Sequence, residues 1–216
     1  YPYYVGGFFD DRNSLICSPT GVVRDPDFFL NAKDVKARTN TEAIAIDRKN
    51  HTVELRDVES GQTDHIEYDK LIITTGAMTK IPPVPGTDLE GITTLYSMKD
   101  ADYLRKIRDD KKITKAVVVG GGLIGIETCE ALQLAGIEIT VVEMLPQILT
   151  FLDLQLAKIL ENHVKANAAN VLTDVSVSAF LGENGHLSAV KLSNGAELPC
   201  QLAVIATGVK PNSAIA

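Results

Sequence analysis

The chain lacks clustered cysteine and histidine residues. It contains three cysteines and four histidines in 216 residues, and neither type recurs at the short spacings that disulfide frameworks or metal sites use. Cys129 and Cys200 fall in apolar segments and are predicted to be small core residues, whereas Cys17 lies in a predicted loop. The sequence therefore predicts no metal site and no disulfide scaffold.

The chain also lacks an excess of positive charge and any long apolar run. Its formal net charge is −7, which argues against nonspecific binding of nucleic acid. The most basic stretch, residues 105–115, is interrupted by Asp109 and Asp110 and is interpreted as a solvated helix end. No apolar run approaches the roughly 18 residues of a membrane span, so no membrane partner is expected. The hydrophobic content of 45% is enough for a core in one or two domains.

Residues 115–143 hold an ordered series of features typical of dinucleotide binding. A short apolar strand is predicted over 116–119 and is followed by a turn. Apolar residues at helical spacing predict a helix over 123–135, and a second strand over 137–142 delivers an acidic residue, Glu143. The turn carries three glycines in G-x-G-x-x-G spacing, namely Gly120, Gly122 and Gly125.

Each glycine of this turn has a separate predicted role. Gly120 allows the tight turn, Gly122 lets the backbone approach a pyrophosphate, and Gly125 lets the helix pack on the strand. The helix N-terminus offers unpaired N–H groups and a positive dipole end to the phosphates. Glu143 can accept hydrogen bonds from ribose hydroxyls and would repel a 2′-phosphate, and the next cation in the sequence is Lys158. The sequence therefore predicts a dinucleotide site in which NAD is favoured over NADP.

A weak internal repeat surrounds this motif. Residues 51–68 alternate apolar and polar side chains about a turn, which predicts a β-hairpin. Residues 68–76 then predict a buried strand that ends at Thr75-Gly76. Residues 187–208 repeat the same order of hairpin, strand and Thr-Gly.

Only the second copy of the repeat has a glycine motif before it. A glycine motif that stood as far before Gly76 as Gly120 stands before Gly208 would lie before Tyr1. We therefore expect the chain to be a piece of a longer polypeptide whose first glycine motif lies outside it. Two such folds in one parent imply two dinucleotides, and the natural pairing is a flavin with a nicotinamide.

Four motifs of the chain resemble those of the flavin- and pyridine-nucleotide-dependent disulfide oxidoreductases. The branch most like it contains coenzyme A-disulfide reductase, NADH oxidase and NADH peroxidase, and the likeness runs essentially from end to end. The motifs are Y-P-Y-Y-V-G-G at 1–7, the strand and Thr-Gly closure at 68–76, V-V-V-G-G-G-L-I-G-I-E at 117–127, and A-V-I-A-T-G-V-K-P-N at 203–212.

The resemblance implies an α/β fold and a two-cofactor chemistry. Residues 1–100 would be the later part of an FAD-binding domain, and residues 101–216 an NAD-binding domain with its return segment. The parent would be a cytoplasmic homodimer that pairs through a further C-terminal domain. NADH would reduce FAD, which would reduce a cysteine-linked acceptor such as coenzyme A disulfide, a persulfide, peroxide or dioxygen. The active cysteine would stand two positions before Tyr1, so no catalytic residue is expected in this segment.

The resemblance also assigns individual residues. Leu123 and Ile124 would begin the helix at the pyrophosphate, and Leu123 departs from the aromatic residue that usually covers the flavin's nicotinamide side. Tyr3 and Tyr4 would lie near the thiol site or would simply pack at a helix end. The remaining assignments are Gly120, Gly122 and Gly125 to the pyrophosphate, Glu127 to the nicotinamide amide, Glu143 to the ribose, Gly208 to the meeting point with the flavin, Thr75 and Gly76 to the ADP half of FAD, and Ala43 to adenine.

Two alternatives stay open at this point. The parent could reduce a small electron-carrier protein of the rubredoxin or ferredoxin type, as relatives without the active cysteine do, although the Pro-Tyr-Tyr segment argues against this. The chain could also be a redox-sensing NAD-binding module without turnover. The two residues before Tyr1 would decide between the first alternative and the disulfide chemistry.

Overall fold

A computed structural model describes all 216 residues of the chain. The fold divides into two compact units. Unit 1 comprises residues 1–10 and 79–210, and unit 2 comprises residues 11–78 and 211–216. This division groups residues 1–10 and 79–100 with the glycine motif, whereas the prediction places all of residues 1–100 in a separate domain. Which cofactor belongs to which part stays a prediction.

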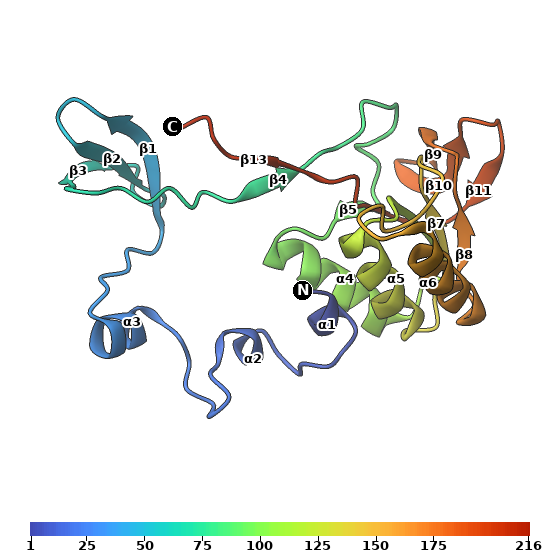
Figure 1. Cartoon of the computed structure of the whole chain (residues 1–216), viewed down its shortest axis with the longest axis horizontal. Helices are drawn as coiled ribbons and strands as arrows, with labels where there is room; N and C mark the ends of the chain where they lie inside the picture. The colour runs from blue at the N-terminus through green and yellow to red at the C-terminus, as the bar shows by residue number, and fades with distance from the viewer. The chain divides into compact units, whose positions relative to one another are not determined.

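The core of unit 1 is a five-stranded parallel sheet (Figure 1). Its strand order is β5-β12-β6-β7-β8, so the chain builds outwards from β6 to β8 and then returns to the other side of β6. Such a reversal is the place where open α/β sheets bind ligands. The predicted α/β class is therefore confirmed. The strands are β5 (Ile92–Thr94), β6 (Lys115–Val119), β7 (Glu138–Val142), β8 (Asn170–Leu172) and β12 (Leu202–Ile205).

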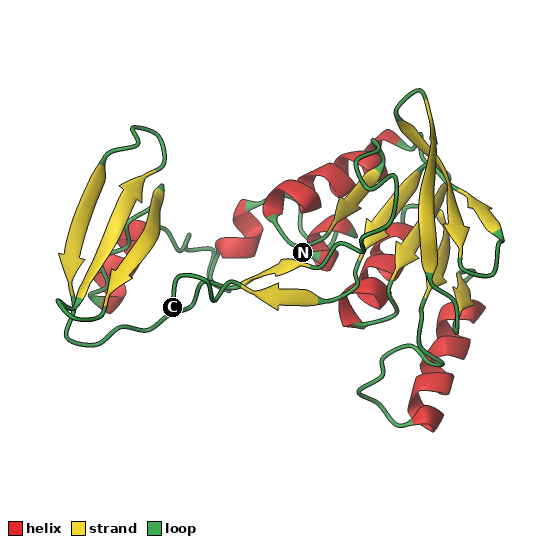
Figure 2. Cartoon of the chain, turned by 90° about the horizontal axis from the view of Figure 1, so that it is seen from above, coloured by secondary structure: helices red, strands yellow, loops and turns green.

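Helices and a second sheet cover this parallel sheet. The helices are α1 (Pro2–Val5), α4 (Met98–Asp110), α5 (Leu123–Gln133) and α6 (Leu154–Ala166). A capping box between Ser97 and Asp100 begins α4. The antiparallel sheet has the order β11-β10-β9 and is seen beside the parallel strands in Figure 2. Its strands are β9 (Val177–Glu183), β10 (His186–Leu192) and β11 (Glu197–Pro199).

The main core of unit 1 lies between these two sheets. Alternate residues of β6, Val117 and Val119, join Phe180 of β9 and Val190 of β10 in one buried cluster. Strands β6 and β7 are apolar and buried at most of their positions, and β12 is buried along its whole length. Such continuous apolar runs are typical of parallel strands that are covered on both faces.

Unit 2 contains the first copy of the repeat. Strands β1 (Thr41–Asp47), β2 (Thr52–Asp57) and β3 (Thr63–Glu67) form an antiparallel sheet in sequence order, so the predicted hairpin is confirmed. The unit also holds two short helices, α2 (Asn13–Ile16) and α3 (Pro26–Lys33).

The predicted strand over residues 68–76 is wrong. The segment is irregular, and Ile72 is 86% exposed. No strand of unit 2 lies beside it to accept and donate the ladder hydrogen bonds that define a strand. The apolar run is therefore present without the neighbours that would make it a strand.

Each Thr-Gly closure is followed directly by one strand of a two-stranded sheet. The sheet pairs β4 (Ala77–Thr79) with β13 (Val209–Pro211). The threonine before each strand makes an equivalent hydrogen bond. Thr75 donates its hydroxyl to the Asn212 carbonyl and Thr207 donates to the Lys80 carbonyl. Each acceptor stands five positions after the threonine of the other copy, so the internal repeat extends to its hydrogen bonds.

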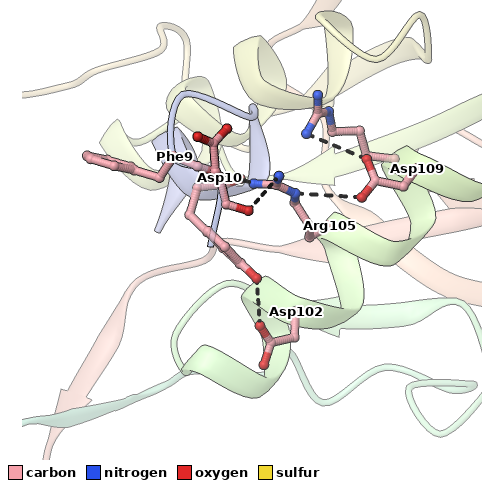
Figure 3. A network of polar contacts seen from close by, with 7 residues as sticks. Phe9, Asp10, Asp102, Arg105 and Asp109 are labelled. Carbon is pink, nitrogen blue, oxygen red and sulfur yellow. Dashed lines mark hydrogen bonds and ion pairs between the residues drawn. The ribbon is translucent and has the colours of Figure 1, made fainter. Parts of the chain in front are cut away.

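The basic stretch 105–115 is not simply a solvated helix end, which corrects the prediction. The Arg105 side chain is only 19% exposed. Its Nη1 donates to the carbonyls of Tyr4 at 2.7 Å and Phe9 at 2.6 Å, and its Nε forms an ion pair with Asp109 at 3.6 Å (Figure 3). A single arginine on α4 thus fixes the segment that follows α1. Its carbonyl partners are almost a hundred positions away in sequence, which is why charge spacing along the helix could not reveal the contact.

No helix of the chain combines the length and the apolar character needed to cross a membrane.

Candidate dinucleotide site

The turn after β6 requires glycine at its first position. Gly120 has φ = +112°, and a Cβ atom there would lie 2.4 Å from the carbonyl oxygen of Ala206. Its N–H donates to the Val142 carbonyl at 2.8 Å. Gly120 therefore sits between the ends of β7 and β12, and both its conformation and its neighbours exclude a side chain.

The third glycine of the motif is required by packing. A Cβ atom on Gly125 would lie 2.0 Å from the Gly120 carbonyl oxygen and 3.4 Å from Val118 of β6. The first turn of α5 therefore rests directly on the strand and on the turn before it. This is the close helix-to-strand approach predicted from the spacing.

The second glycine faces open space. Gly122 is the N-cap of α5, and a Cβ atom there would meet no atom within 4 Å. The cap has no side-chain partner, so the first N–H groups of α5 are directed at this space. The fold thus leaves room on the one glycine that is predicted to touch a pyrophosphate, while it fills the space around the other two.

Glu143 lies beside the turn, at the end of β7. It is 8% exposed, and its two carboxylate oxygens accept backbone hydrogen bonds from Gly121 at 2.7 Å and Leu145 at 2.8 Å. An ionised carboxylate has about four acceptor positions, so acceptor capacity is left for ribose hydroxyls. The next cation, Lys158, is bound to Glu161 at 2.7 Å.

The first residues of α5 differ in their surroundings. Leu123 is 56% exposed, and its expected place on the nicotinamide side of a flavin stays a prediction. Ile124 is also exposed, and its carbonyl accepts the Thr128 hydroxyl. Glu127 lines a small pocket of about 90 Å³ together with Tyr3 and Phe8.

The two N-terminal tyrosines are placed differently. Tyr4 is buried, and its hydroxyl donates to Asp102 of α4 at 3.0 Å. Tyr3 is exposed and makes an edge-to-face contact with Phe8 at 5.6 Å between ring centroids. Tyr4 therefore packs as a structural residue, and a role for Tyr3 near a thiol stays a prediction.

The return strand brings its closure to the same edge of the sheet. The Ala206 N–H donates to the Val119 carbonyl at 2.8 Å, which places the end of β12 against the end of β6. Gly208 follows with φ = +92° and has open space on its Cα. The fold thus sets Ala206 and Thr207 against Gly120, while the predicted place of Gly208 where the NAD site meets the flavin stays a prediction.

The residues predicted to contact FAD lie in unit 2. Ala43 and Thr75 line one pocket of about 230 Å³, mostly with apolar side chains from residues 71–73. Gly76 adopts φ = +68°, and its carbonyl accepts the Asn212 N–H. The structure therefore brings Ala43 and Thr75 together, while their predicted contact with adenine and the ADP half of FAD stays untested.

The cysteines do not form a reactive pair. Burial raises the pKa of both Cys129 and Cys200 to about 12, which keeps these thiols protonated and inert. Both are confirmed as buried core residues. Cys17 is partly exposed and forms an isolated bridge with Val23. No three histidine, cysteine, aspartate or glutamate residues of the chain gather as metal ligands would.

Sequence reasoning missed Gly121. A Cβ atom there would lie 2.7 Å from Ile148 and 3.2 Å from the Cβ of Glu143. Its carbonyl accepts the Leu149 N–H at 2.8 Å. The motif gives no role to this position. The only signal that could have suggested one is that Gly121 completes a run of three consecutive glycines, 120–122.

Comparison with known proteins identifies relatives of the chain. The family model described as pyridine nucleotide-disulphide oxidoreductase matches residues 16–216. An NADH oxidase of Methanocaldococcus jannaschii is 29% identical over 216 residues, which cover 100% of this chain and 46% of that protein. An NADH oxidase of Enterococcus faecalis is 33% identical over 213 residues, which cover 97% of this chain and 45% of that protein. The chain therefore spans about half the length of these curated relatives.

A solved structure shares the fold over almost the whole chain. A NAD-dependent persulfide reductase from A. fulgidus superposes with a TM-score of 0.92 at 36% identity. The match covers 99% of this chain and 39% of that one.

Proposed function

Because the chain belongs to the pyridine nucleotide-disulphide oxidoreductase family, we propose that its glycine turn, residues 120–125, binds NADH for a flavoprotein oxidoreductase. The observation that carries the proposal is the contrast among the three motif glycines. Gly120 and Gly125 are packed against backbone, whereas Gly122 opens onto free space at the N-terminus of α5. A pyrophosphate placed there would meet N–H groups and the positive end of the helix dipole.

The residues around the turn favour NADH over NADPH. Glu143 holds a buried carboxylate where the adenosine ribose would lie, and it has acceptor capacity left for ribose hydroxyls. A 2′-phosphate at the same place would meet this negative charge, and the next cation along the chain is already paired. Readers of NADP usually place an arginine near the phosphate, and this chain has none in the loop after β7.

The activity of the whole protein extends the proposal. A bound reduced nicotinamide supplies a hydride, and FAD would relay the electrons to a small thiol-derived or oxygen acceptor. In this chain, the turn and Glu143 would hold the nucleotide, Gly208 would leave room where it meets the flavin, and Thr75 and Gly76 would border the ADP half of FAD. Relatives include NADH oxidases, a persulfide reductase and a coenzyme A disulfide reductase, so dioxygen, persulfide and coenzyme A disulfide are candidate acceptors, and the family resemblance adds peroxide.

Reduction of a small electron-carrier protein is the second candidate. A rubredoxin-NAD(+) reductase of Pseudomonas putida is also a relative, at 28% identity over 192 residues. The Pro2-Tyr3-Tyr4 segment, which resembles that following an active cysteine, favours the disulfide-type chemistry. A cysteine two positions before Tyr1 in the parent would support the first candidate, and another residue there would support the second. A binding module without turnover would bind NADH but reduce no acceptor in the complete protein.

Titration of the chain with NADH and NADPH by calorimetry tests the site. We expect NADH to bind more tightly than NADPH. Gly122→Val should abolish NADH binding while the fold stays intact. The protein without nucleotide has room for the valine side chain, but that side chain would occupy the space that the pyrophosphate needs. Circular dichroism and thermal unfolding provide the control for folding. Normal NADH binding by this variant would show that the phosphate site lies elsewhere.

The flavin is tested separately. The 216 residues contain a single G-x-G-x-x-G motif, so we expect the chain by itself to bind NADH but to hold FAD poorly and to reduce no disulfide. The measurements are the visible spectrum of the purified chain and NADH-dependent reduction of coenzyme A disulfide with added FAD. A yellow, active protein would contradict the assignment of the flavin site.

A further inference from the structure

Gly121, in the glycine turn, is hydrogen-bonded through both its N–H and its carbonyl to the end of β7 and the segment that follows. Gly121 donates its N–H to the Glu143 carboxylate at 2.7 Å. Its carbonyl accepts the N–H of Leu149 at 2.8 Å. The other oxygen of Glu143 accepts the N–H of Leu145 at 2.8 Å. The carboxylate thus bridges the glycine turn and the loop 144–149, and that loop returns to the turn from the other side.

The packing around this bridge leaves little freedom. Ile148 is completely buried, and it lies so close to Gly121 that a Cβ atom there would be 2.7 Å from its Cγ2. Leu149 is buried as well and adopts φ = +49°. A bulky residue in the left-handed region is strained, and it persists only where its surroundings hold it. The loop 144–149 is therefore held against the glycine turn at an energetic cost.

We infer that Glu143 is a positioning residue as well as a ribose reader: with the loop 144–149 it holds the glycine turn in its binding shape before any nucleotide arrives. This inference rests on the proposed nucleotide site. Loss of a residue that only reads the ribose would weaken NADH binding and strengthen NADPH binding, because the hydrogen bonds to the ribose and the repulsion of a 2′-phosphate are both lost. A positioning residue affects both nucleotides, because both present the same pyrophosphate to the turn. The apparent affinity falls in proportion to the fraction of molecules with a competent turn.

The two roles predict different results for Glu143→Ala. Removal of the carboxylate leaves the N–H groups of Gly121 and Leu145 without their acceptor, which is most costly for the buried donor of Gly121. Without nucleotide, we expect both amides to exchange with deuterium at least about tenfold faster. We expect NADH affinity to fall at least about tenfold and NADPH affinity not to rise.

A second variant separates the turn from the charge. Gly121→Ala keeps the carboxylate but forces the turn away from Ile148. We expect the affinities for NADH and NADPH to fall by the same factor, within about twofold, so that the preference for NADH is unchanged. A merely structural defect elsewhere would not produce both results, namely faster exchange at these two amides in Glu143→Ala and an unchanged preference for NADH in Gly121→Ala. Glu138→Ala is the matched control, because it removes an exposed carboxylate from the same strand, β7. It should alter neither exchange nor affinity.

The inference is overturned if Glu143→Ala leaves the exchange of both amides unchanged and binds NADPH more tightly than the unmodified chain does. It is also overturned if Gly121→Ala weakens only one nucleotide. If the unmodified chain binds neither nucleotide, the proposed function fails. In that case the exchange rates alone decide the positioning role, with faster exchange in Glu143→Ala supporting it and unchanged exchange refuting it.

Discussion

The two copies of the internal repeat have similar sequences and different structures. Residues 202–205 form β12, which lies between β5 and β6 and is almost completely buried. Residues 71–75 begin with a similar apolar run, Leu-Ile-Ile, yet they form no strand and Ile72 is 86% exposed. The Thr-Gly closures that follow are nevertheless alike, since Gly76 and Gly208 both have positive φ. An apolar run needs neighbouring strands to become a strand, whereas a closure of two residues is a local structure.

Amide hydrogen exchange should show the largest difference between the copies. The amides of β12 lie within ladders on both sides, so they should exchange only on global or subglobal unfolding of unit 1. The amides of residues 71–75 have no backbone acceptor in the chain and should exchange almost as fast as in an unfolded peptide. Exchange resolved by residue checks this prediction, and strong protection of residues 71–75 would contradict it.

Matched isoleucine substitutions should separate the copies next. Ile205 is 1% exposed, so Ile205→Ala should lower the free energy of unfolding of unit 1 by about 2–5 kcal/mol. Ile72→Ala removes the same atoms from an exposed position and should change stability by no more than about 0.5 kcal/mol. Denaturant unfolding measures both values. Equal losses would mean that residues 71–75 are buried like their counterpart.

The cysteines extend the comparison to the two units. Cys129 and Cys200 of unit 1 keep their protons up to about pH 12 because of burial, whereas an unfolded thiol ionises near pH 8.5. The folded state therefore binds more protons in this window, and stability should fall as the pH rises, by up to about 1.4 kcal/mol per pH unit for each thiol. Unfolding between pH 8 and 10 checks this.

A thiol reagent gives an independent reading of the same difference. At pH 8, we expect only Cys17 of unit 2 to react in the folded chain, and all three thiols to react after unfolding. The Cys129→Ala and Cys200→Ala variants should each lose part of the alkaline destabilisation. Rapid reaction of either buried thiol in the folded chain would contradict the prediction.

The closures should show the smallest effect and no difference. Thr75 and Thr207 each donate one hydroxyl hydrogen bond to a backbone carbonyl. Thr75→Val and Thr207→Val should each cost about 1 kcal/mol of stability, because each removes one ordinary hydrogen bond. Thermal unfolding of the two variants measures this. A loss confined to one of them would show that the two closures are not equivalent.

The contacts that make the site could be predicted only in part. The roles of Gly120 and Gly125 follow from spacing because a turn and the helix after it are joined within a few residues. The Gly121–Glu143–Leu149 contacts and the Arg105 contacts with Tyr4 and Phe9 could not be predicted, because the partners are joined by hydrogen bonds that leave no periodic pattern in the sequence. Position 121 is an unspecified residue in the motif, and Arg105 is one of several cations on an apparently exposed helix.

By itself, the sequence determined the strand–turn–helix–strand unit over residues 115–143, the hairpins of both repeats and the two Thr-Gly closures. These features depend on backbone preferences, side-chain periodicity and contacts between near neighbours, which a short window of sequence contains. Only the tertiary structure decided that β12 returns beside β6, which brings Ala206 against Gly120 of the glycine turn. It also decided that residues 71–75 are irregular and that Glu143 is bonded to the turn. Strand pairing and buried hydrogen bonds join residues far apart in the chain, so they depend on which partners the rest of the fold supplies.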